Sequence, residues 1–254
     1  MNAVPSLPGR IRLDELLVLR GEFASRSRAR DAIARGAVRV GGAVATKAGL
    51  LVANEAVIEV DDPARRYVSR AALKLIAGLD HFRLDPKGAV ALDIGASTGG
   101  FTQVLLERGA AHVIALDVGH GQIDSSLVGD PRVTLIEGLN ARDLTTAHLG
   151  GQRPDFLVSD VSFISLKLAM PPALEIAAPG AAAVFLVKPQ FEAGREAIGK
   201  GGVLRDPALA ERIAEDLRAW LDAFPAWHAV GLCPSPIEGG DGNREFLLGG
   251  LKDS

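Results

Sequence analysis

The stretch VALDIGASTGGFTQVLL, residues 90–106, constrains the fold of this chain more than any other feature. A short apolar run leads into a cluster of glycines and then into a second apolar segment with helical spacing. This is the pattern of a buried strand, a tight turn and a helix, where α/β proteins often bind nucleotide-like cofactors. Gly95 opens the turn, and Gly99 and Gly100 would let a ligand approach the backbone without meeting a Cβ atom.

Two acidic residues at the ends of buried runs bear on which cofactor this is. Asp93 lies near the end of the first run, and Asp117 ends the next one, AHVIALD, at 22 positions after Gly95. That spacing suits a carboxylate that meets ribose hydroxyls. The dinucleotide pattern G-x-G-x-x-G is absent, and a carboxylate at position 93 would repel a pyrophosphate. The sequence therefore favours S-adenosylmethionine, which has no phosphate and carries an amino group and a sulfonium.

Later apolar runs also end in polar side chains. Asp160 follows FLVS, Lys188 follows AAAVFLV, and Glu245 precedes FLL. In a doubly wound sheet, ligands bind outside the carboxyl ends of the parallel strands, so we expect Asp160 and Lys188 near the cofactor turn. After the apolar run VTLIEG, residues 133–138, Asn140 or Asp143 could hydrogen-bond an adenine edge. Either residue could equally form a turn or cap a helix, and the sequence leaves these alternatives open.

The first fifty residues differ in charge from the rest of the chain. They hold nine basic and four acidic side chains, whereas the whole chain has a formal net charge of −3. Leucines at 13, 16 and 17 predict a short amphipathic helix, and Ser25 or Ser27 could cap a second one that ends at Gly36. Alternation around Arg39 and a break at Gly41 predict a β-turn-β unit. A basic module of this kind suggests nucleic-acid binding.

The segment RLDELLVLRGEFASRSRARDAIARGAVRVGG resembles the S4 RNA-binding domain. The resemblance implies a module that grips folded RNA through its helical face and through backbone contacts. The RNA-binding residues expected on this basis are Arg10, Arg12, Arg20, Arg26, Arg28, Arg30, Arg65 and Arg66.

The remainder of the chain resembles the FtsJ-type RNA ribose 2′-O-methyltransferases, which use a Lys-Asp-Lys-Glu tetrad. The motifs that carry this resemblance are DIGASTGGFTQ, KPQFE and GNREF, and the tetrad matches are Lys74, Asp160, Lys188 and Glu245. With an S4 domain in front, the chain is similar to the haemolysin A/TlyA family from about Arg10 to Leu248. One departure is Thr98, where FtsJ relatives carry proline.

This resemblance implies methyl transfer from S-adenosylmethionine to a ribose 2′-hydroxyl of ribosomal RNA. Lys188 would act as the general base, Asp160 would orient it, and Lys74 and Glu245 would position the hydroxyl and a neighbouring phosphate. The expected partner is ribosomal RNA or a ribosomal subunit. The expected cofactor-binding residues are Asp93, Gly95, Ser97, Gly99, Gly100, Phe101, Asp117 and Asn140.

We therefore expect an α/β fold: a Rossmann-like methyltransferase with a doubly wound, mostly parallel sheet, preceded by a small α+β S4 domain. The expected boundaries are a flexible tail at 1–9, the S4 domain at 10–62, a linker at 63–69 and the methyltransferase domain at 70–254.

Other functions remain as alternatives. They are a membrane-acting haemolysin, a non-catalytic RNA-binding or ribosome assembly factor, and a base-directed methyltransferase. Against the first, no apolar stretch reaches about 18 residues, and the N-terminal segment lacks the apolar core of a secretory signal. The single cysteine, Cys233, and the scattered histidines predict neither a disulfide nor a metal site. We expect a cytoplasmic protein without metal or membrane partners.

Overall fold

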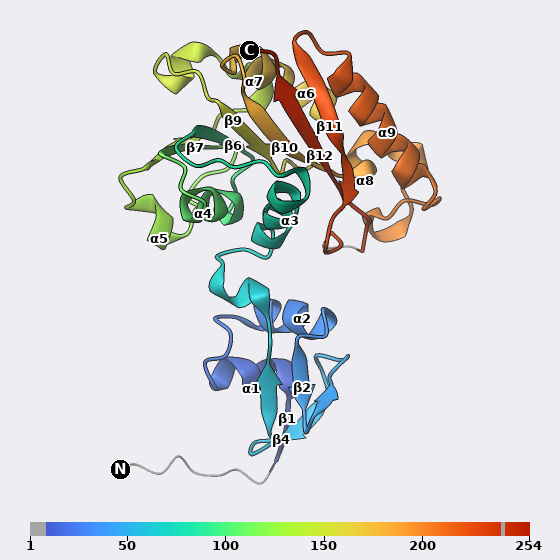
Figure 1. Cartoon of the computed structure of the whole chain (residues 1–254). Helices are drawn as coiled ribbons and strands as arrows, with labels where there is room; N and C mark the ends of the chain where they lie inside the picture. The colour runs from blue at the N-terminus through green and yellow to red at the C-terminus, as the bar shows by residue number, and fades with distance from the viewer. Residues whose placement is uncertain (1–8, 240–241) are drawn as a thin grey trace. The chain divides into compact units, whose positions relative to one another are not determined.

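The computed structural model describes residues 9–239 and 242–254, and these form two compact units (Figure 1). The boundary between the units in sequence falls between Arg66 and Tyr67, within the predicted linker 63–69. Nearly all of the predicted tail 1–9 lies outside the described residues. Among the described residues, no helix combines the length and the apolar character that crossing a bilayer requires.

The first unit packs two short helices against two small antiparallel sheets. Leu13, Leu16 and Leu17 are buried, as the helical spacing predicts, and Ser25 rather than Ser27 caps the second helix by accepting a hydrogen bond from the amide of Arg28. The sheets have the orders β1-β4 and β3-β2-β5. The elements are β1 (Arg10–Arg12), α1 (Leu13–Leu19), α2 (Arg26–Ala34), β2 (Val38–Val40), β3 (Ala43–Val44), β4 (Leu51–Ala53), β5 (Ile58–Val60) and a 3₁₀ helix (Pro63–Arg66).

The predicted β-turn-β unit is the hairpin of β2 and β3. Gly41 and Gly42 form its two-residue turn, with φ angles of 55° and 82°. Positive φ at both central positions gives a type I′ turn, whose twist matches that of the flanking strands and which glycine adopts without strain.

The second unit is built around one seven-stranded sheet. Its strand order is β11-β12-β10-β9-β6-β7-β8. The five strands from β10 to β8 are parallel, and β12 runs antiparallel to both of its neighbours, β10 and β11. The strands are β6 (Val90–Ile94), β7 (His112–Asp117), β8 (Val133–Glu137), β9 (Phe156–Ser159), β10 (Ala182–Val187), β11 (Trp227–Pro234) and β12 (Phe246–Lys252).

Helices cover both faces of this sheet (Figure 1). α3 and α4 share one apolar core with one face, while α6, α7 and α9 share a second core with the other. Because the central parallel strands are buried on both faces, they read as continuous apolar runs in the sequence. The helices are α3 (Ala72–Phe82), α4 (Gly100–Glu107), α5 (Ser125–Val128), α6 (Leu166–Ala169), α7 (Pro171–Ile176), α8 (Pro189–Glu192) and α9 (Leu209–Asp222).

The strand order reverses between β6 and β9. From β6 the chain proceeds to β7 and β8 on one side and then returns to β9 on the other. Their carboxyl ends are in register, since Ile94 pairs with Ser159, so Gly95 and Asp160 leave the sheet side by side. In open α/β sheets such a reversal creates the crevice in which ligands bind.

Candidate functional site

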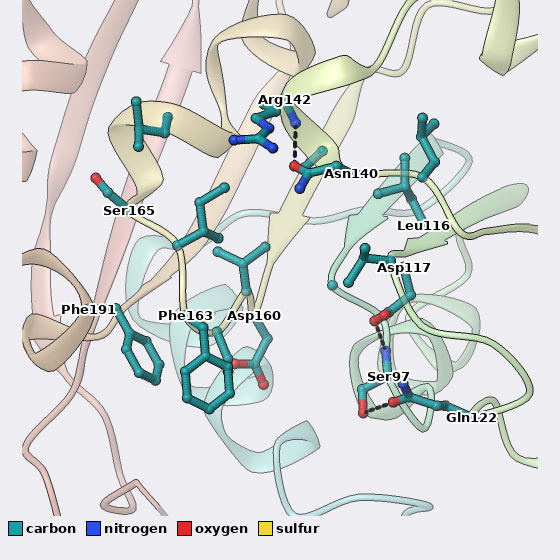
Figure 2. Close-up of a pocket in the computed structure, with 18 residues that line it drawn as sticks. Ser97, Leu116, Asp117, Gln122, Asn140, Arg142, Asp160, Phe163, Ser165 and Phe191 are labelled. Atoms are coloured by element: carbon teal, nitrogen blue, oxygen red, sulfur yellow. Dashed lines mark hydrogen bonds between the residues drawn. The ribbon is translucent and has the colours of Figure 1, made fainter. Parts of the chain in front are cut away.

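A pocket of about 750 Å³ lies at the carboxyl ends of the parallel strands (Figure 2). Its walls are the segments that follow β6, β7, β8 and β9, together with Phe191 of α8. We call it the strand-end pocket. Of the residues predicted to bind cofactor, those that line it are Gly95, Ser97, Asp117 and Asn140.

Asp117 is held at the pocket by backbone amides from two turns. Its Oδ2 accepts a hydrogen bond of 2.8 Å from the amide of Ser97, and its Oδ1 accepts one of 2.7 Å from the amide of Gly119. Ser97, with φ at 47°, in turn donates its hydroxyl to Gln122 (Figure 2). A carboxylate has about four acceptor positions. Asp117 is therefore fixed in place and can still accept hydrogen bonds from a ligand diol.

The structure makes Asn140 both a cap and a pocket residue. Its side-chain oxygen accepts a hydrogen bond from the amide of Arg142 at the start of a 3₁₀ helix (Ala141–Asp143), and its side chain also lines the pocket. Asp143, the alternative for an adenine contact, is exposed and does not line the pocket. The two functions proposed for Asn140 are thus compatible, and an adenine contact stays a prediction.

The remaining predicted cofactor residues lie away from the pocket wall. Phe101 is a residue of α4, and its side chain packs in the core. A Cβ atom at Gly99 would come within 2.4 Å of the Leu127 side chain, and one at Gly100 within 2.8 Å of Ser69. Among the described residues, the lack of a side chain at these two glycines therefore lets the Leu127 and Ser69 side chains pack closely against the backbone. Their contact with a cofactor stays a prediction.

Asp93 is completely buried beside the turn. Its Oδ2 accepts a 2.6 Å hydrogen bond from the hydroxyl of Thr102, while its Oδ1 has no hydrogen-bond partner among the described residues. Burial raises the pKa of Asp93 to about 7; the Thr102 hydrogen bond opposes this shift, and the charges of Asp160 and Asp117 add to it. A buried carboxylate oxygen without a partner fits the amino group or sulfonium of S-adenosylmethionine.

The raised pKa of Asp93 predicts a pH-dependent stability. Aspartate in an unfolded chain titrates near pH 4, so between pH 4 and 7 the folded state holds the proton more tightly and stability falls as the pH rises. We expect wild type to lose about 2–3 kcal/mol more than Asp93→Asn between pH 5 and 8, as measured by urea unfolding. If the free energies of unfolding of the two proteins changed in parallel between pH 5 and 8, Asp93 would already be ionised in the folded protein at pH 5.

The predicted catalytic residues form two ion pairs. Lys188, directly after β10, places its Nζ 2.6 Å from Asp160 Oδ1, and both side chains are mostly buried. Lys188 Nζ also donates to Ser162 Oγ at 2.8 Å and to the carbonyl of Asp160 at 3.4 Å. Pro189 begins α8 directly after Lys188, which keeps an extended backbone with ψ at 91°. Asp160 lines the strand-end pocket (Figure 2), so this pair stands at its edge.

The second pair joins α3 to the start of β12. Lys74 Nζ lies 2.5 Å from Glu245 Oε2, and the two side chains are only 7% and 3% exposed. The structure buries Lys74, one of the four tetrad matches, against this partner. β10 pairs with β12 so that Val187 faces Phe246. Lys188 directly follows β10 and Glu245 directly precedes β12, so the same antiparallel register brings these two residues to the same edge of the sheet.

Several residues near the site were not predicted from the sequence. Phe163 is 90% exposed, has a φ of 63°, and its ring lies 4.9 Å from that of Phe191. A bulky residue in the left-handed region is strained, and such strain concentrates at functional sites. The only signal in the sequence was an aromatic residue close to each of Asp160 and Lys188.

Asn243 is a second missed residue. It is 3% exposed, accepts a hydrogen bond from the amide of Leu204 and donates one to the carbonyl of Gly202. It therefore ties the glycine-rich segment 199–205 to the chain just before Glu245. A polar residue inside the GNREF motif was the available signal.

In the first unit, several of the predicted RNA-binding arginines have internal partners. Arg12 and Arg26 both pair with Asp14, whose side chain is fully buried. Arg20 donates to backbone carbonyls of Asn54 and Ala56, and Arg65 pairs with Glu22. Within the described residues, Arg10 and Arg30 are exposed and make no ion pair. Arg28 and Arg66 also interact with other groups of the protein, so they are not free arginines either.

The comparisons with known proteins match this organisation. Residues 67–252 match the model of the FtsJ-like methyltransferase family, and residues 11–58 match that of the S4 domain. The chain is 46% identical to a Mycobacterium tuberculosis protein named 16S/23S rRNA (cytidine-2′-O)-methyltransferase TlyA, over 94% of this chain and 89% of that protein. It is 40% identical to Hemolysin A of Brachyspira hyodysenteriae, over 93% and 98% of the two chains.

A solved structure of a Streptococcus thermophilus protein, which likewise carries a hemolysin name, is 38% identical, with a TM-score of 0.74 over 98% of this chain and 90% of that one. The predicted fold class is therefore confirmed: an S4 domain precedes an α/β methyltransferase unit with a mostly parallel sheet. Among the described residues, no cluster of side chains could hold a metal ion. The chain belongs to the FtsJ-like methyltransferase family, in its branch that carries an S4 domain.

Proposed function

We propose that the protein transfers a methyl group from S-adenosylmethionine to the ribose 2′-hydroxyl of a cytidine in ribosomal RNA. The observation that carries this proposal is the Lys188–Asp160 ion pair at the edge of the strand-end pocket. The name of the Mycobacterium tuberculosis relative supports the choice of cytidine and of ribosomal RNA. The S4 domain supports an RNA substrate.

The pocket residues fit S-adenosylmethionine. Asp117 suits the ribose diol and Asn140 the adenine edge. Asp93 is not part of the pocket wall, but its buried Oδ1 has no partner among the described residues and suits the cationic end. When bound, the cofactor supplies an electrophilic methyl group on sulfur. The chain's own contribution is to hold the 2′-hydroxyl in line with that methyl group and to take its proton.

Lys188 is placed to accept the proton of the ribose hydroxyl. Three oxygen acceptors surround Nζ, from the Asp160 carboxylate, the Asp160 carbonyl and the Ser162 hydroxyl. Nζ donates hydrogen bonds to the carbonyl and to the hydroxyl and lies within ion-pair distance of the carboxylate, so these oxygens fix its position. Asp160 thus orients the base and balances the charge that the base acquires. Lys74 and Glu245, buried as a pair, would position the ribose.

In the first unit, we propose that Arg10 and Arg30 contact RNA phosphates. Both are exposed and make no ion pair with the described residues, so contacts with phosphate would displace only water. Arg12 and Arg26 instead neutralise the buried Asp14, so their replacement would also disturb the fold of the unit.

A direct test combines purified ribosomal subunits with this protein and labelled S-adenosylmethionine. We expect label in ribosomal RNA at cytidine, with the neighbouring phosphodiester resistant to alkali, because a 2′-O-methyl group blocks the attack that cleaves RNA. Label on a base would instead establish a base-directed methyltransferase. Calorimetry that detects no cofactor binding would support a non-catalytic assembly factor, and leakage of lipid vesicles would support a haemolysin.

Phe163 offers a stacking surface for the target nucleotide. Its ring is 90% exposed beside Asp160, and stacking of a base on an aromatic side chain is worth about 1–3 kcal/mol. We expect Phe163→Ala to raise KM for ribosomal RNA by about 5- to 150-fold with little change in cofactor affinity. Leu168→Ala is the matched control, since Leu168 is also exposed in the same pocket but is aliphatic. Equal KM changes in the two variants would argue against stacking.

A further inference from the structure

Two segments that contribute residues to the site contact each other at three places along their length. One segment, residues 160–166, leaves β9 and enters α6; the other, residues 188–192, leaves β10 and forms α8. Lys188 contacts Asp160 and Ser162, the Phe191 ring contacts that of Phe163, and Glu192 contacts Ser165 and Leu166. The contacts follow the same order along both segments, so Glu192 fastens the end farthest from the ion pair.

Both carboxylate oxygens of Glu192 are used in this contact. Oε2 accepts a hydrogen bond of 2.5 Å from Ser165 Oγ, and Oε1 accepts one of 2.7 Å from the amide of Leu166. Ser165 Oγ in turn accepts a hydrogen bond from the amide of Lys167 and so caps α6. Hydrogen bonds to a carboxylate are shorter and stronger than those between neutral groups.

Part of the segment that Glu192 fastens is exposed, although Val161, Ile164 and Leu166 pack against the core. Ser162 and Phe163 are both exposed, and Phe163 is held at a strained positive φ. The amide of Asp160 donates to the carbonyl of Ile94, so the sheet holds its backbone. Ser162, which accepts a hydrogen bond from Lys188, depends instead on what anchors the far end of the segment. A displacement of about 1 Å at a reacting group can lower the rate about 100-fold.

We propose that Glu192 is a positioning residue for methyl transfer. It holds the end of this segment against α8 and thereby fixes Ser162 and Phe163 beside the Lys188–Asp160 pair at the strand-end pocket, without itself touching the substrate or the cofactor. The inference rests on the proposed function, because the reaction it serves is the one described above.

The test compares Glu192→Gln with wild type. Glutamine preserves the size of the side chain but cannot accept two charge-assisted hydrogen bonds. We expect kcat to fall about 10- to 100-fold, with KM for S-adenosylmethionine within about twofold of wild type and the melting temperature lowered by only a few degrees. Hydrogen exchange at the Leu166 amide should become faster in the variant. Glu215→Gln, an exposed residue of α9 paired with Arg218, is the matched control and should behave as wild type.

A double variant separates positioning from general damage. If Glu192 acts through the ion pair, adding Glu192→Gln to Lys188→Ala should slow the residual single-turnover rate by less than about threefold, because coupled residues are not additive. Full additivity, or a kcat within twofold of wild type with unchanged exchange at Leu166, would overturn the inference. If wild-type protein does not methylate ribosomal RNA at all, the proposed function fails, whereas the exchange measurement still reports on the Glu192 contact.

Discussion

Lys188→Ala is expected to lower kcat for methyl transfer by at least about 100-fold, because general base catalysis typically contributes about 10²–10⁴-fold. The Nζ of Lys188 is the group placed to take the hydroxyl proton, and it has three oxygen acceptors around it. RNA binding should survive, since Lys188 belongs to the methyltransferase unit and the S4 domain is untouched. Single-turnover transfer of label to ribosomal subunits measures the rate, and filter binding measures RNA affinity.

Two further variants sharpen this result. Arginine stays protonated at all accessible pH values, so Lys188→Arg keeps the charge but cannot act as a base. Activity near wild type in Lys188→Arg would assign Lys188 an electrostatic role instead. Lys167→Ala removes an exposed lysine of the neighbouring α6 and should leave the rate unchanged. Turnover near wild type in Lys188→Ala would rule out this residue as the base.

Lys74→Met is expected to have the largest effect on stability. It leaves Glu245 buried without its partner, and breaking a buried ion pair from one side costs about 3–5 kcal/mol. For a unit of this size, the melting temperature should fall by about 10 °C or more. Urea unfolding followed by circular dichroism measures the change.

Removing both charges separates structure from catalysis. Replacing a buried ion pair by apolar side chains of similar size is often neutral or stabilising, so Lys74→Met combined with Glu245→Leu should recover most of the lost stability. Methyl transfer should remain strongly reduced if the pair positions the ribose. Recovery of activity along with stability would show that the pair serves the fold alone.

Local patterns in the sequence predicted the elements that depend on local chemistry. The glycine turn after residue 94, the strand-end placement of Asp160 and Lys188, and the β-turn-β unit at Gly41 all follow from spacing and backbone preference. The four tetrad residues were predicted from the resemblance of their motifs to the FtsJ-type enzymes. In the structure they form two ion pairs, Lys74 with Glu245 and Lys188 with Asp160.

Three-dimensional packing decided what the sequence did not reveal. A central parallel strand is buried on both faces, so no periodicity told whether Asp93 points to the ligand or to Thr102. Asp14 reads as an ordinary acidic residue in the first turn of α1, yet it is buried and neutralises two arginines that were expected on the RNA surface. The Glu192 contact joins the end of α8 to the start of α6, and a contact between two single-turn helices leaves no repeat in the sequence.

The place of β12 in the sheet has a consequence for biosynthesis. β12 follows every other strand in the sequence, yet it inserts between β10 and β11 and starts beside Glu245. Until β12 has been translated, β10 and β11 each have an edge whose backbone groups are unpaired, and such edges are prone to non-native pairing. A nascent chain that stops before residue 245 would have the cofactor turn but only half of its charged pairs. Completion of the site is thus tied to β12, whose residues are translated after those of β10 and β11.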